Sequence, residues 1–343
     1  MGTDQVQALD AADLTAMTTA QIVALTTAQA AALTTAQVAA LTTAQIAALE
    51  TADLVKLGTA QIAALTTAQA TALTTAQVAS MQTADVAALS VTQVASLNTA
   101  SVAALSSTQA QALSSAQVAS LTTTQIGALE TADLSAMSSA QLAGLSVTQI
   151  GKLSTAQVAA LTTGQVAGLS ATQVASLSSA ATAALTTSQV QALTTAQVRG
   201  LTSTQLNSLT TTQFASLSAI QVGGLSTTQM ASLSTDLVKA LTTGQAAGLT
   251  ATQLNGLTTA QIGSMDTADV AALNASALSK LSTANVGALS SDQVKALGGQ
   301  QLQSLSSAQL VAMGDDVTEL NTAQLSGLKA SQISGLTTAQ LDG

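Results

Sequence analysis

The sequence of 343 residues contains no cysteine, proline, histidine, tryptophan or tyrosine, and it has a single phenylalanine. Without cysteine and histidine the chain has no thiol nucleophile, no imidazole base, no disulfide framework and no Cys/His zinc site. A serine nucleophile needs an activating base, and the usual one is missing. We therefore expect no enzymatic activity.

Charged residues are also scarce. Asp, Glu, Lys and Arg make up 7% of the chain, and the net charge is −9. Seven Lys and Arg residues are too few for the basic face that nucleic acids and anionic membranes require. Thr, Ser and Gln interrupt every apolar run before it is long enough to span a bilayer. We expect neither nucleic-acid binding nor membrane insertion.

What the sequence has instead is an eight-residue repeat. Leu or Met occupies position 1 and every eighth position up to Met313, one seven-residue unit covers residues 313–319, and the register resumes at Leu320. We label the positions a to h, with Leu at a, as in LTTAQIAA of residues 41–48. This register predicts a single continuous array over residues 1–343. Because it starts and ends at octad boundaries, it also fits a piece cut from a longer array.

Each octad carries a signal for starting a helix. Position b is mostly Ser or Thr, and position e is mostly Gln. In this capping-box pattern the b side chain accepts a hydrogen bond from the e amide, and the Gln side chain accepts one from the b amide. The Leu at a and the aliphatic residue at f form the accompanying hydrophobic staple. A helix that restarts in every octad is about a turn and a half long, from c to h.

The few charges support this helical interpretation. Helix N-termini favour acids and helix C-termini favour bases. Apart from Glu319 and Asp342, every acid lies at positions b to e, and apart from Lys329, every base lies at g or h. A β-solenoid, the alternative for a short repeat, predicts no such polarity. It would also place a and f on opposite faces of one strand, because they are five residues apart.

Two apolar side chains per octad cannot stabilise so short a helix alone, so neighbouring octads must bury them together. We therefore predict an all-α solenoid, a superhelix of very short helices with one helix per octad. Its spine is Leu, Val and Ile, and its exterior is Thr, Ser, Gln and Ala. The sequence does not give the number of octads in one superhelical turn.

Two kinds of acidic unit are candidate sites. In five octads Asp replaces Gln at e while an acid or Gln stands at b, and the seven-residue unit carries three acids. Paired carboxylates, joined by a neighbouring unit, supply the oxygen ligands that Ca²⁺ prefers. Alternatively, the acidic octads are helix caps, and the short unit is a tolerated deletion in which Val317 takes position f. The Ca²⁺ candidates are Asp10, Asp13, Glu50, Asp53, Asp85, Glu130, Asp133, Asp266, Asp269, Asp315, Asp316 and Glu319.

The octad motif, LTTAQVAAL when the next Leu is included, resembles repetitive regions of large secreted or cell-surface bacterial proteins. The resemblance covers the whole chain. It implies an extracellular stalk, adhesin, surface-layer or filament segment. Some of those proteins also carry glycine-rich calcium-binding repeats, which this sequence lacks.

These observations together predict a non-enzymatic structural repeat protein that serves as an extracellular spacer, surface-layer or self-assembling filament component on a bacterial cell surface. The low charge density gives little mutual repulsion, so the expected partner is a second copy, joined end to end or side by side. We expect no cofactor, and Ca²⁺ is the one alternative. The alternative function is a Ca²⁺-dependent or ice-binding adhesive solenoid, in which rows of Thr and Ser at b and c form the binding surface.

Overall fold

The computed structural model describes residues 1–342 of the chain. Within this range the elements are forty-two α-helices of four to six residues and one 3-10 helix, and no strand is present. The predicted all-α fold of one short helix per octad is therefore confirmed. The chain divides into two compact units, Met1–Leu177 and Ser178–Gly343.

The helices of the first unit are α1 (Thr3–Gln7), α2 (Ala11–Ala16), α3 (Thr19–Val23), α4 (Thr27–Ala32), α5 (Thr35–Ala40), α6 (Thr43–Ala48), α7 (Thr51–Leu54), α8 (Thr59–Ala63), α9 (Thr67–Ala72), α10 (Thr75–Ser80), α11 (Thr83–Ala88), α12 (Val91–Ser96), α13 (Thr99–Ala103), α14 (Ser107–Ala112), α15 (Ser115–Ser120), α16 (Thr123–Ala128), α17 (Thr131–Ala136), α18 (Ser139–Ala143), α19 (Val147–Ile150), α20 (Thr155–Ala160), α21 (Thr163–Gly168) and α22 (Ala171–Ala175).

The helices of the second unit are α23 (Ser179–Ala183), α24 (Thr187–Ala192), α25 (Thr195–Gly200), α26 (Ser203–Ser208), α27 (Thr211–Ala215), α28 (Ala219–Gly223), α29 (Thr227–Ser232), α30 (Thr235–Lys239), α31 (Thr243–Ala247), α32 (Ala251–Gly256), α33 (Thr259–Ser264), α34 (Thr267–Ala272), α35 (Ala275–Leu278), α36 (Thr283–Val286), α37 (Ser291–Lys295), α38 (Gly299–Ser304), α39 (Ser307–Ala312), η1 (Gly314–Glu319), α40 (Thr322–Ser326), α41 (Ala330–Ile333) and α42 (Thr338–Asp342).

The predicted capping box forms in most octads, and residues 41–48 show its geometry. The Gln45 amide donates to the Thr42 hydroxyl at 3.2 Å, and the Thr42 amide donates to Gln45 Oε1 at 2.8 Å. Thr42 itself has extended backbone angles, and α6 runs from position c to position h. The repeated box therefore restarts the helix in each octad, as the spacing predicts.

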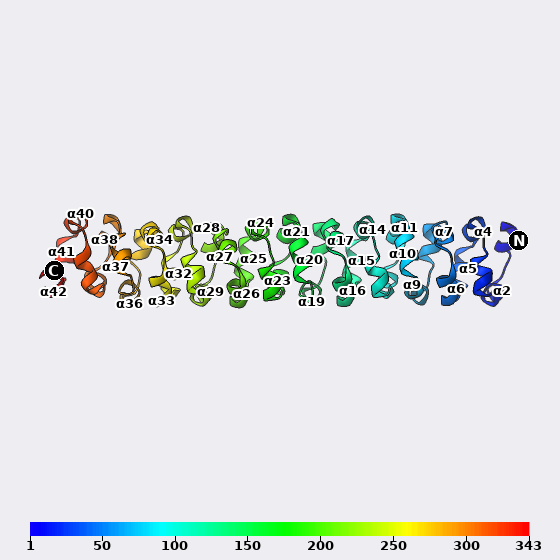
Figure 1. Cartoon of the computed structure of the whole chain (residues 1–343), viewed down its shortest axis with the longest axis horizontal. Helices are drawn as coiled ribbons and strands as arrows, with labels where there is room; N and C mark the ends of the chain where they lie inside the picture. The colour runs from blue at the N-terminus through cyan, green and yellow to red at the C-terminus, as the bar shows by residue number, and fades with distance from the viewer. Residues whose placement is uncertain (343) are drawn as a thin grey trace. The chain divides into compact units, whose positions relative to one another are not determined.

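Three octads make one turn of each solenoid. In the first unit α14 packs against α11 and α17, and in the second α31 packs against α28 and α34. Figure 1 shows α11, α14 and α17 one after another along the same edge of the first unit. Within each unit a helix thus stacks on the helices three places before and after it, in the nearest-neighbour arrangement of repeat proteins.

The side chains at a and f form the core of both units. Leu41 at a is 4% exposed and Ile46 at f is completely buried. Phe214, the single aromatic residue, occupies an f position in the second unit and is also completely buried. The predicted Leu/Val/Ile spine is therefore confirmed, with the f side chains innermost.

The predicted exterior is wrong at position e, because most of the glutamines there are buried. Gln77 is 1% exposed, and its Nε2 donates to the carbonyl oxygens of Ile46 and Leu49, each at 2.8 Å. These residues are at positions f and a, in the octads four and three places earlier. A capping Gln has a free amide nitrogen, and burial is favourable only if that donor is satisfied. The carbonyls of the preceding turn satisfy it.

The seven-residue unit folds as η1, a 3-10 helix that begins at Gly314, whose φ is +61°. Val317 is 1% exposed, so it fills position f as predicted. The Gln at e of the next octad, Gln324, still reaches a carbonyl at a, that of Leu297 at 2.8 Å. One residue fewer separates the two, and the same backbone position accepts the bond. The short unit is a deletion that the stacking tolerates.

Candidate functional site

The five acidic octads do not share one structure. At Asp10 and Asp13 the expected cap forms: the Asp13 amide donates to Asp10 Oδ1 at 2.8 Å, and the Asp10 amide donates to Asp13 Oδ2 at 3.3 Å. Both residues are exposed. This pair is an acidic version of the ordinary capping box, and its charges lie at the positive end of α2, where acids are stabilising.

In the other four acidic octads the b side chain makes no cap hydrogen bond. This holds for Glu50, Gln82, Glu130 and Asp266. These residues occupy the N-cap position without a capping hydrogen bond, and only their place at the positive end of the helix agrees with the interpretation of the acidic octads as caps. The Asp at e lies in the interior instead, and the residues concerned are Asp53, Asp85, Asp133 and Asp269, between 1% and 4% exposed.

The buried aspartates occupy the place of the buried Gln side chain without its donor. The Oδ2 atoms of Asp53, Asp133 and Asp269 are buried and have no hydrogen-bond partner among the described residues. Asn285, a neutral side chain of the same shape at position e, donates from Nδ2 to the carbonyls of Leu254 and Leu257, each at 3.4 Å. A side chain as short as Asp thus reaches both carbonyls of the preceding turn when it carries a proton donor.

Burial raises the pKa of all four interior aspartates above the ordinary value of 3.8, because it disfavours the ionised form. The largest effect is at Asp269, where burial and the nearby charge of Asp266 raise the pKa to about 6. At Asp133 a hydrogen bond from the Ser107 hydroxyl, 2.9 Å long, opposes the rise in pKa.

The acids of the seven-residue unit face different partners. Glu319 forms an ion pair with Lys295 at 2.9 Å, with both side chains about half exposed. The Ser291 hydroxyl donates to Asp316, and the Thr318 hydroxyl donates to the backbone carbonyl of Asp315. The carboxylates of Glu319 and Asp316 therefore have different partners, a lysine and a serine hydroxyl.

The geometry expected for a calcium site can now be compared with the positions of the candidates. Across residues 1–342, no three acidic side chains lie close enough together to hold a metal ion. Each acidic octad offers its own b and e residues, and no neighbouring unit brings a third carboxylate to them. The pairs at Glu50 and Asp53, Glu130 and Asp133, and Asp266 and Asp269 consequently remain separate.

The model of the ALTTAQ repeat matches residues 6–43, 46–83, 78–115, 126–163, 191–219 and 262–299. The matched stretches cover more than half of the chain and lie in both units. The chain belongs to the ALTTAQ repeat family. No curated protein matches the chain. The resemblance of the octads to an LTTAQ-type repeat is thereby confirmed.

The residues that the sequence argument missed are the Nε2 groups of the ALTTAQ glutamines. A signal for them is present in the sequence. A capping box accepts Glu as well as Gln at the third helical position, and an acid there is favoured by the helix dipole. Nevertheless, position e never contains Glu in this chain. An ionised Glu has no proton to donate to the carbonyls of the preceding turn, whereas Gln satisfies both the cap and those carbonyls.

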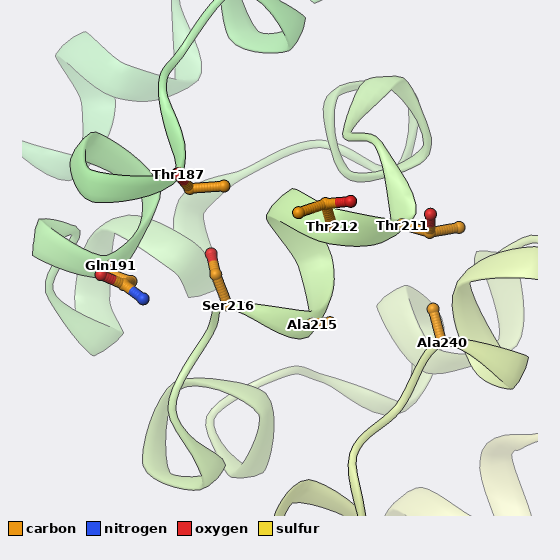
Figure 2. Close-up of a pocket in the computed structure, with 7 residues that line it drawn as sticks. All are labelled: Thr187, Gln191, Thr211, Thr212, Ala215, Ser216 and Ala240. Atoms are coloured by element: carbon orange, nitrogen blue, oxygen red, sulfur yellow. The ribbon is translucent and has the colours of Figure 1, made fainter.

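The surface of the ALTTAQ array has shallow hollows between consecutive turns. One of about 590 Å³ lies over α24, α27 and the residue after α30, and Figure 2 shows Gln191 on one side of it, with Thr211 and Ala240 on the other. Its lining contains hydroxyl, amide and methyl groups and no charged side chain. None of the helices described in residues 1–342 is both long and apolar enough to cross a membrane.

Proposed function

We propose that this ALTTAQ repeat chain is a non-enzymatic structural element that acts as an extracellular spacer, surface-layer or filament component. The observation that carries the proposal is the recurrence of one hydrogen-bonded junction, in which a Gln at e joins its own helix start to the preceding turn. It is found at Gln77 in the first unit and at Gln253 in the second, where Nε2 donates to the carbonyls of Val222 and Leu225 at 2.9 and 3.0 Å. A repeated, equivalent junction suits a load-bearing role more than a single active site.

Self-association of the chain is supported by an apolar surface on α40, α41 and α42. Leu325, Ile333 and Leu341 occupy position f but are 40%, 42% and 56% exposed. No further turn of the described chain covers them. The Nε2 groups of Gln5 and Gln21, at the start of the first unit, have no acceptor within residues 1–342. A second copy that packs one of its turns on this apolar surface would repeat the ordinary junction between turns, and such a head-to-tail contact propagates into filaments.

Sedimentation velocity over a range of concentrations, followed by negative-stain electron microscopy, tests this assembly. We expect filaments or concentration-dependent oligomers of the unchanged chain. A double variant, Ile333→Lys with Leu341→Lys, should prevent them. The matched control is Ile220→Lys, because Ile220 is 77% exposed on the side of the second unit. Loss of association in the control alone would indicate lateral packing, and a strictly monomeric unchanged chain would refute self-assembly.

The extracellular placement is supported by the resemblance of the octads to repetitive regions of secreted and cell-surface proteins. Surface labelling of intact source cells with an antibody against the repeat tests it directly. Labelling only after the cells are permeabilised would contradict the placement while leaving the structural role intact.

Ice binding is a second candidate, favoured by one row of threonines. Thr27, Thr51, Thr75 and Thr99 are exposed at position c of α4, α7, α10 and α13, which stack consecutively in the first unit. Thermal hysteresis of the purified chain tests this function, and its absence would dismiss it. If hysteresis is present, Thr51→Lys with Thr75→Lys should abolish it. The control Thr67→Lys should not, because Val91 already interrupts the row through α9 and α12.

A further inference from the structure

At three junctions between turns, position e holds a carboxyl group with an unpartnered buried oxygen, where most of the other junctions have a carboxamide. Asp53 in α7, Asp133 in α17 and Asp269 in α34 are 1%, 2% and 3% exposed, and each has a buried Oδ2 without a partner. By the register of the repeat, these oxygens face the backbone carbonyls 28 and 31 residues earlier, the positions that accept from Gln77 and from Asn285. Two acceptors then face each other with no hydrogen between them.

The carbonyls at position a, 28 residues before each aspartate, are those of Leu25, Leu105 and Leu241. None of them receives a hydrogen bond from the described chain. An ionised carboxylate beside an unpaired buried carbonyl has two costs. Its charge is desolvated, and neither Oδ2 nor the carbonyl oxygen has a hydrogen-bond donor. A single proton on Oδ2 removes both problems, since it neutralises the charge and supplies the missing donor.

We propose that Asp53, Asp133 and Asp269 are proton-operated junctions: as neutral carboxylic acids they donate to a main-chain carbonyl of the preceding turn, and on ionisation they weaken the contact between the two turns. The solenoid is therefore tighter in acid than at neutral pH at these three places. Junctions with Gln at e do not respond, because a carboxamide does not titrate in this range.

The charges around the three carboxyls favour the neutral form or leave it undisturbed. Asp53 has Glu50 before its helix and Lys56 after it, while the stacked helices α4 and α10 contain no charged residue. Asp133 has only Glu130 nearby, because α14 and α20 are uncharged.

Asp269 has Asp266 at the start of its own helix. Of the two helices stacked on it, α31 is uncharged and α37 carries Asp292 and Lys295. Lys295 is directed to Glu319, with which it is paired at 2.9 Å. The acids next to the three carboxyls oppose a second negative charge, which is consistent with an acid accompanying each of these aspartates at b.

The direction of the pH effect follows from the raised pKa of the buried carboxyls. A group whose pKa is higher in the folded chain binds its proton more tightly there, so its contribution to stability is complete below the unfolded value and is lost as the pH rises through the folded one. For Asp269 this window runs from 3.8 to about 6.

Thermal unfolding followed by circular dichroism, at several values between about pH 7.5 and about pH 5, tests the proposal. The melting temperature of the unchanged chain should rise as the pH falls. The triple variant Asp53→Asn, Asp133→Asn, Asp269→Asn has donors like that of Asn285, and it should lose this rise and be more stable than the unchanged chain at neutral pH. Equal pH profiles for the two chains would overturn the proposal.

The reverse substitution provides a matched gain of function. In the octad of Asn285, position b holds Ser282 and not an acid. The Ser282 hydroxyl caps the helix by accepting a hydrogen bond from the Asn285 amide at 3.1 Å. Asn285→Asp should add a new loss of stability as the pH rises from about 5 towards neutral. As a readout that needs no variant, the carboxyl carbon signals of ¹³C-labelled aspartate should include four that titrate above the rest, those of Asp53, Asp85, Asp133 and Asp269. Stabilisation of the unchanged chain by millimolar Ca²⁺ at neutral pH, absent in the triple variant, would show that a cation rather than a proton closes the junctions.

Discussion

The side-chain amide of Gln45 donates to the backbone carbonyl of Met17, 28 residues earlier, at 2.8 Å. The same side chain accepts the amide of Thr42 through Oε1 at 2.8 Å, and it donates to Leu14 at 2.7 Å. One carboxamide therefore pairs backbone groups at both ends of very short helices. Its oxygen accepts from an amide at the start of its own helix, and its nitrogen donates to carbonyls at the end of a helix in the preceding turn. Local capping and stacking of turns depend on the same residue.

The first prediction concerns this double role. Gln261 donates to the carbonyls of Met230 and Leu233 at 3.0 and 2.7 Å and is 3% exposed. Gln261→Met keeps the side-chain volume but leaves these two buried carbonyls unpaired, at about 1–3 kcal/mol for each of them. It also removes the partner of the amide of Thr258, which is an exposed residue. We expect the free energy of unfolding to fall by roughly 2–5 kcal/mol in urea titrations.

The control for this prediction is Gln191→Met at position g, where the side chain is exposed. Its effect should stay within about 0.5 kcal/mol. Similar losses in the two variants would mean that the contribution of Gln at e comes from helix propensity and not from the contacts between turns.

The second prediction concerns the single aromatic side chain. Phe214 is completely buried at f, whereas Ile220, six residues later, is 77% exposed. Phe214→Ala should lower the free energy of unfolding by about 3–5 kcal/mol, because it removes transfer energy and leaves a cavity. Ile220→Ala should change it by less than about 0.5 kcal/mol. A small effect at Phe214 would show that the stacked turns collapse to fill the space.

The sequence predicts the local part of this fold well because its signals are local. The capping box of Thr42 and Gln45 and the staple of Leu41 and Ile46 lie within eight residues, and they define where each helix starts and which side chains are buried. The number of octads per turn is a different matter. It depends on how neighbouring helices stack, and the hydrogen bond from Gln45 to Met17 crosses 28 residues. No short-range pattern encodes that distance.

The acidic octads illustrate the same limit. The pairing of Asp at e with an acid at b is visible in the sequence, and it suggests either caps or ligands. Whether Asp269 is buried or exposed depends on the turns that stack on α34. The interpretations as caps and as ligands are both local, so neither predicts the burial of Asp269. Asp13 shows the contrast: it has the same residue type at the same position, yet it is exposed and forms an ordinary box with Asp10. The position of the octad within the stack of turns, and not the residue type, decides that Asp269 is buried and Asp13 is exposed.

The third prediction concerns two glycines of the first unit. A Cβ added at Gly127 inside α16 would meet nothing within 4 Å, whereas one added at Gly151 would lie 2.8 Å from the backbone oxygen of Ser176. Gly127→Ala should therefore raise the free energy of unfolding by about 0.5–1 kcal/mol through helix propensity. Gly151→Ala should lower it despite the same gain, because the backbone of the next turn must move. Stabilisation by both substitutions in thermal unfolding would contradict the close approach of these turns.

The fourth prediction concerns resistance to force, which a structural role requires. Each turn contacts only the turns before and after it, so mechanical unfolding should proceed in small steps and not in one event for each unit. A turn of three octads releases 24 residues, which extend to roughly 80 Å at about 3.3–3.6 Å per residue. We expect single-molecule force–extension curves with increments of this size. The Gln261→Met chain should show one step at lower force than the unchanged chain, because one junction has lost its hydrogen bonds. A single large increment for a whole unit would show that coupling between turns exceeds the stability of any one of them, and the chain would then behave as a rigid spacer with no capacity to extend gradually.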